Sequence, residues 1–160
     1  MNFGIPAPVC FAIIAIVIFV VWQIYKRKIQ RINQMPDIPP TIPEKGFEVP
    51  ILATFTGSKT LPRQISSSHN NLNPSLTLFE DRLDCKVILK KSILFGEIEN
   101  VDIWDTLATR NLQIYAKGRE DLFSANLLNR RNLAQVLRFL ENRSVPLSNR
   151  SKAFLSANSA

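Results

Sequence analysis

The sequence is poor in the residues that build metal sites and disulfide frameworks. Among 160 residues there are two cysteines and one histidine, whereas a structural zinc site needs about four such ligands. Cys10 lies in an uncharged segment and Cys85 in the charged remainder of the chain. A disulfide framework is therefore excluded, and two reduced thiols fit a cytosolic domain.

Glycine is also scarce, with 5 residues, so backbone cradles for phosphate are not expected. The sequence contains no GxSxG, HExxH, phosphate-loop or EF-hand pattern. The acidic residues Glu80, Asp81 and Asp84 imitate a metal site, although carboxylates on a turn are by default solvated. His69 lies among serines and asparagines and is interpreted as solvated. We therefore expect no enzymatic activity, no cofactor and no metal.

Charge is absent from the first 25 residues, so all 33 charged side chains (20 basic and 13 acidic) fall in the other 135 positions. The run Val9–Tyr25 (VCFAIIAIVIFVVWQIY) contains one strongly polar residue, Gln23. Extended back to Ile5, it reaches roughly 30 Å as a helix, the thickness of a bilayer core. We predict a transmembrane helix, with residues 5–25 in contact with the lipid bilayer.

Other origins of this run fit less well. A cleaved signal peptide has a positive region before its apolar run, and none is present here. A lipid anchor on Cys10 would need a longer apolar run before the cysteine. A helix that is apolar on all sides is also unlike the surface helix of a globular domain.

Basic residues follow the apolar run directly and predict its orientation. Lys26, Arg27, Lys28 and Arg31 come after the helix, and no basic side chain precedes it. By the positive-inside rule the N-terminus lies outside and the soluble domain in the cytoplasm. The expected location is the cell (inner) membrane, spanned once.

Composition divides the chain into four parts. Residues 1–25 form the transmembrane helix. A basic and then Pro-rich linker follows over residues 26–45, where Pro36 should end the helix and later prolines form a semi-rigid spacer. The soluble domain spans 46–145, with its best-supported part at 75–143, and contains a polar loop at 57–74. Residues 146–160 are predicted to be a flexible tail.

The soluble domain has strand patterns followed by one helix. Alternating apolar residues from Ser75 onward predict short antiparallel strands, with Leu83, Cys85, Val87 and Leu89 on one buried face. Lys117-Gly118-Arg119 predicts a hairpin turn. The final segment predicts an amphipathic helix that begins near Asn129 and ends near Asn142. Its apolar stripe consists of Leu133, Val136, Leu137 and Leu140.

This pattern resembles the bacterial pleckstrin-homology-like domain. The resemblance covers Leu76 to Leu140 and is carried by LTLFEDRLDCKVILKKSILFGEIENVDIW, NLQIYAKGREDLFSANL and RNLAQVLRFL. It implies an α+β fold, an antiparallel β-barrel or sandwich closed by a C-terminal amphipathic helix, with Phe47–Phe55 as a further strand. Bacterial members often stand beside transmembrane helices. The phosphoinositide-binding residues of eukaryotic members have no counterparts that can be carried over.

Basic charge is concentrated at two places. The net charge is +3 over residues 26–43, zero over 44–100 and +4 over 101–160. The stripe of the last helix leaves four arginines toward solvent, where anionic lipid head groups or a membrane protein partner could meet them. The expected contact residues are Lys26, Arg27, Lys28, Arg31, Arg130, Arg131, Arg138 and Arg143. Nucleic-acid binding would need a groove-reading helix or exposed aromatics among these residues, so we expect none.

These features predict a single-pass membrane protein that presents a cytoplasmic pleckstrin-homology-like binding or scaffolding module at the membrane surface. The alternative is an accessory subunit of a larger membrane transport or enzyme complex.

Overall fold

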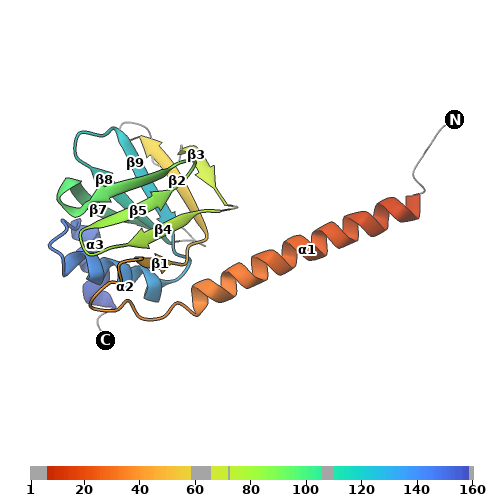
Figure 1. Ribbon diagram of the computed structural model, residues 1–160, viewed down its shortest axis with the longest axis horizontal. Coiled ribbons are helices and arrows are strands. Elements are labelled where there is room, and N and C mark those ends of the chain that lie inside the picture. The colour runs from red at the N-terminus through yellow and green to blue at the C-terminus, as the bar shows by residue number, and fades with distance from the viewer. Residues whose placement is uncertain (1–6, 59–65, 72, 106–109, 159–160) are drawn as a thin grey trace.

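The computed structural model describes residues 7–58, 66–71, 73–105 and 110–158, with one long helix that projects from a β-rich domain (Figure 1). The elements are α1 (Ala7–Asn33), β1 (Phe47–Val49), β2 (Ala53–Ser58), β3 (Ser66–Asn70), β4 (Ser75–Leu78), β5 (Arg82–Lys86), β6 (Lys90–Leu94), the 3-10 helix η1 (Phe95–Glu97), β7 (Ile98–Asp105), β8 (Arg110–Ala116), β9 (Asp121–Asn126), α2 (Arg130–Glu141) and α3 (Asn149–Ala157).

Helix α1 contains the uncharged run and continues beyond it. Its 27 residues give a length of about 40 Å at 1.5 Å per residue. Residues 8–22 are exposed in the isolated chain, and the helix is long and apolar enough to cross a membrane. It extends two turns past Tyr25 and ends just before Pro36, as predicted from the proline.

The domain consists of two antiparallel sheets. Sheet A has the strand order β1-β4-β5-β6, and sheet B has the order β3-β2-β9-β8-β7. The predicted hairpin at Lys117-Gly118-Arg119 joins β8 to β9, and Gly118 has a φ of 67° that favours glycine. The chain passes from one sheet to the other between β1 and β2, between β3 and β4, and through η1 between β6 and β7.

The core lies between the two sheets. Leu76, Leu83 and Ile93 of sheet A are buried with Leu112 and Ile114 of sheet B. Among the described strands the two sheets do not join into a closed barrel. The predicted α+β class is therefore seen, whereas the predicted closed barrel is not. At the end of β5 a side chain rather than strand pairing links the sheets, because Thr54 Oγ1 donates to the Lys86 carbonyl at 2.7 Å.

Helix α2 has the predicted position and stripe. Asn129 caps its N-terminus by accepting a hydrogen bond from the Asn132 amide, and the C-cap is Asn142. Leu133, Val136 and Leu137 are all buried in the core, together with Leu140. In Figure 1, α2 and α3 lie together beside the lower end of the sheets.

Two predicted flexible segments contain regular structure. The expected tail forms α3, which Ser148 caps and which buries Leu155. Its register is fixed because Ser151 Oγ donates to the Val101 carbonyl of β7. The expected loop at 57–74 contains β3, which pairs with β2; residues 59–65 and 72 lie outside the described residues.

The Pro-rich linker is packed on the domain and is not a free spacer. Met35 and Ile42 of the linker are buried in the core. Glu80 accepts a hydrogen bond from the Ile42 amide, and Arg143 donates to the Pro40 carbonyl at 3.2 Å. Directly after the linker, Gly46 has a φ of 80° and lies so close to Thr77 that there is no room for a Cβ atom.

Candidate functional site

The end of α1 is fixed to the soluble domain by buried contacts. Ile32 is 1% exposed, and its carbonyl accepts a hydrogen bond of 2.7 Å from the buried Asn132 side chain of α2. Next to it, the side-chain amide of Asn129 donates a hydrogen bond to Asn33 Oδ1 at 3.3 Å. The Ile32 carbonyl also accepts a longer hydrogen bond of 3.4 Å from the Met35 amide. A buried hydrogen bond between two elements favours one geometry, because a shift that breaks it inside the buried site leaves polar groups poorly satisfied.

A second contact lies about one helical turn earlier on α1. Lys28 Nζ of α1 donates to the Asn71 carbonyl at 2.7 Å, in the connection between β3 and β4. In Figure 1 this connection lies on the side of the domain from which α1 extends. The domain is therefore in contact with the last turns of α1 at two places, and its orientation relative to the helix is defined.

The eight predicted contact residues fall into two groups in the structure. Lys26, Arg27, Lys28 and Arg31 lie on the last turns of α1. Lys26 lies 5.1 Å from the centre of the Trp22 ring, an arrangement typical of a helix end at a membrane interface.

The four arginines of the C-terminal region do not form one free basic face. Arg130, Arg131 and Arg138 are exposed, but Arg131 pairs with Asp37 at 2.9 Å and Arg138 donates to the Asn158 carbonyl. The expectation of solvent exposure is wrong for Arg143, which is half-buried, stacks on Phe139 at 3.7 Å and pairs with Glu80. Three of these arginines thus hold the linker and α3 on α2.

The turn between β5 and β6 exposes two large apolar side chains. Ile88 is 69% exposed and Leu89 is 75% exposed, although the alternation had placed Leu89 on the buried face. The face assignment holds through Val87 and is wrong beyond it, because β5 ends at Lys86. The turn is held in place by Asn70, whose side-chain amide donates to the Val87 carbonyl at 2.7 Å.

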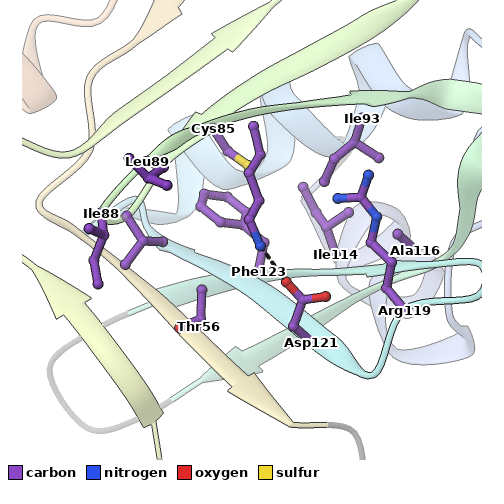
Figure 2. A pocket seen from close by; sticks show the side chains of 12 residues that line it. Thr56, Cys85, Ile88, Leu89, Ile93, Ile114, Ala116, Arg119, Asp121 and Phe123 are labelled. Atoms are coloured by element: carbon purple, nitrogen blue, oxygen red, sulfur yellow. Dashed lines mark hydrogen bonds and ion pairs between the residues drawn. The ribbon is translucent and has the colours of Figure 1, made fainter.

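Behind this turn an apolar pocket of about 340 Å³ lies between the two sheets (Figure 2). The pocket is open to solvent on one side and extends inward to core residues such as Cys85 and Ile114. Eight of its twelve lining residues are apolar; they are Cys85, Val87, Ile88, Leu89, Ile93, Ile114, Ala116 and Phe123. The other four are Thr56, Lys91, Arg119 and Asp121.

An ion pair crosses the opening of the pocket. Lys91 of β6 and Asp121 of β9 are 2.6 Å apart, and Figure 2 shows Asp121 next to Arg119 in the lining of the pocket. The Lys91 hydrogen bond holds the pKa of the Asp121 carboxyl below its usual value, against the opposing effect of burial. Lys91 and Arg119 together carry two positive charges and Asp121 one negative charge, so the net charge at the opening is positive.

Cys85 lines the inner wall of the pocket. It is 3% exposed, and burial raises the pKa of its thiol to about 12. The prediction that Cys85 is buried is confirmed. A thiol with such a pKa is almost wholly protonated near neutral pH and contributes to the pocket as a small apolar group.

Each acidic residue near β5 has its own basic partner, so these residues do not form one shared cluster. Glu80 pairs with Arg143, Asp81 with Arg82 and Asp84 with Lys90. Burial alone would raise the pKa of Asp84, but hydrogen bonds from Ser92 and Lys90 outweigh it and hold the pKa below its usual value. Within the described ranges, no group of three or more histidine, cysteine or acidic side chains could hold a metal ion.

Sequence reasoning did not identify the pocket, because its walls come from β2, β5, β6, β8 and β9, which meet only in the fold. One signal was present in the sequence: the apolar run Val87-Ile88-Leu89 is followed directly by Lys90-Lys91 at the position of a turn. Apolar residues at an exposed turn, flanked by lysines, are typical of a surface that contacts a ligand or a membrane.

Comparison with known proteins leaves the family open. No protein-family model matches the chain, and no curated protein matches it significantly. The structural class is therefore defined by the chain itself: an N-terminal apolar helix followed by an α+β domain of two antiparallel sheets.

Proposed function

We propose that the protein is a single-pass membrane protein whose α1 anchors a binding domain on the cytoplasmic face of the cell (inner) membrane. The observation that carries the proposal is the fixed junction at Ile32, where the carbonyl at the end of α1 is bonded to the buried Asn132 of α2. A flexible tether would only keep the domain near the bilayer. A helix end that is docked on the domain also determines which side of the domain faces the bilayer.

We further propose that the domain is a bacterial pleckstrin-homology-like module that acts by binding rather than by catalysis. The order of its parts supports this assignment: two packed antiparallel sheets, a last hairpin with a glycine turn, and an amphipathic helix packed into the core. The largely apolar pocket with a charged opening supports a binding role, because ligand sites commonly combine an apolar cavity with a few polar groups.

Labelling of single cysteines in intact cells tests the orientation. In a Cys10→Ser background, Ser156→Cys reports the position of the exposed C-terminal helix, and Asn2→Cys is the matched control before α1. The proposal expects a membrane-impermeant thiol reagent to label Asn2→Cys in intact cells and Ser156→Cys only after permeabilisation. Labelling of Ser156→Cys in intact cells would overturn the cytoplasmic placement.

A further inference from the structure

With α1 placed in the bilayer as proposed, the β5–β6 turn is connected through hydrogen bonds to the part of α1 just past the bilayer. Lys28 is three residues past Tyr25, which corresponds to about 5 Å along the helix axis, and its Nζ is bonded to the Asn71 carbonyl at 2.7 Å. The neighbouring Asn70 is bonded to the Val87 carbonyl at 2.7 Å. Two hydrogen bonds and one peptide unit thus connect the end of the apolar run to this turn.

This position explains the exposed side chains of the turn. The head-group layer is about 5–8 Å thick on each side of the hydrocarbon core, so a turn at this level reaches the layer. Ile88 and Leu89 are more than two-thirds exposed, and both line the pocket. Two exposed apolar side chains of the turn therefore border the pocket.

The size and the charge of the pocket define the chemistry of its ligand. A cavity of about 340 Å³ has the volume of about eleven waters at roughly 30 Å³ each, and a methylene group is of similar size. It thus has room for most of one acyl chain. The opening carries Lys91 and Arg119 against Asp121, a net positive charge that is complementary to an anionic head.

We infer that this pocket binds a single acyl chain of an anionic amphiphile taken up from the adjacent leaflet, with Ile88 and Leu89 of the turn among the apolar side chains that contact it. The apolar walls at Ile93, Ile114 and Phe123 contact the chain, and Lys91 exchanges part of its ion pair with Asp121 for the head group. The inference rests on the proposed membrane placement of α1.

The test uses the full chain in nanodiscs of neutral phosphatidylcholine. The probe is palmitic acid with a diazirine in mid-chain, at mildly alkaline pH where its carboxylate is ionised. After irradiation, labelled residues are identified by peptide mass spectrometry. We expect labels on α1, which contacts the bilayer, and on pocket residues of β6, β8 and β9.

Substitutions and a second probe separate the apolar contribution from the charge. The double substitution Ile88→Ser with Leu89→Ser should reduce pocket labelling several-fold and leave α1 labelling unchanged. Leu94→Ser is its matched control, because Leu94 is an exposed leucine of β6 that does not line the pocket. The same chain with an alcohol head should label the pocket several-fold less than the acid. Lys91→Gln should remove this preference, whereas the exposed Lys152→Gln should keep it.

The outcomes distinguish the two proposals. Labels on α1 without labels in the pocket overturn the ligand site and leave the membrane placement intact. Labels in the pocket without labels on α1 overturn the membrane placement, and labels on neither overturn both. Equal pocket labelling by the acid and the alcohol overturns the anionic head.

Discussion

Replacement of Asn132 by alanine should release the soluble domain from its fixed position on α1. The side chain is 1% exposed and donates to the Ile32 carbonyl at the end of α1. Without it, the buried Ile32 carbonyl keeps only the long hydrogen bond of 3.4 Å from the Met35 amide, and the loss of the shorter bond costs about 1–3 kcal/mol. A change of this size raises the population of the undocked state about 5- to 150-fold.

Limited trypsin digestion of the full chain in nanodiscs measures this population. Arg27, Lys28 and Arg31 lie at the docked end of α1, and cleavage there releases the domain from the membrane fraction. Where opening and closing are fast, cleavage follows the population of the open state. The release rate of Asn132→Ala should therefore rise by the same factor, while the released fragment stays resistant to further digestion.

Glu141→Ala is the matched control, because Glu141 is an exposed residue of the same helix and far from the junction in sequence. Its release rate should stay within about twofold of the unsubstituted chain, as expected for a surface change of under about 0.5 kcal/mol. If Asn132→Ala also releases the domain at the unsubstituted rate, the junction is held by other contacts and the reasoning fails. Faster release with rapid breakdown of the fragment would show instead that the whole domain has been destabilised.

Two further predictions concern the stability of the domain. Cys85→Ser should destabilise it by roughly 1–3 kcal/mol, because a hydroxyl replaces a thiol in an apolar wall; an unchanged melting curve would show that Cys85 does not contact the core as described. The hydrogen bond from the Ile42 amide, followed by that from Arg143, holds the pKa of the Glu80 carboxyl below its ordinary value. The stabilisation that the Glu80 carboxylate gives to the folded domain is therefore fully present above the pKa of the unfolded chain, and it is lost as the pH falls through the lower pKa of the folded chain. Thermal melting of Glu80→Gln should therefore show less loss of stability than the unsubstituted chain in the acidic range below about pH 4.5, and identical pH profiles would argue against the linker contact.

The elements that could be predicted from the sequence are those with a local, repeated pattern. The uncharged run predicts α1, the spacing of Leu133, Val136 and Leu137 predicts α2, and Gly118 marks the last hairpin. Each signal depends only on residues within a few turns of one another. Burial of Cys85 belongs to the same class, because it follows from alternation along one strand.

The remaining features depend on contacts between residues distant in sequence. Helix α3 is polar in composition, and it is fixed by Ser151 and Leu155 on β7 and the core. The linker is held by Arg143, about 100 residues later in the chain. The pocket lies between the two sheets, and its lining residues come from strands that are distant in sequence. No single segment of the sequence therefore predicts it. Local patterns therefore predicted the apolar helix α1, the last hairpin and α2, but not the way in which these parts are joined.

The unbroken helix at the junction also makes the domain sensitive to rotation of the anchor. A helix advances 1.5 Å and turns about 100° with each residue, and Ile32 ties that rotation to the domain. One residue inserted in α1 between the uncharged run and Lys28 would turn the domain relative to that run by more than a quarter circle about the helix axis, with a shift of only about 1.5 Å along the axis. Neighbouring membrane proteins would then meet a different side of it, so the length of α1 sets the direction in which the domain points.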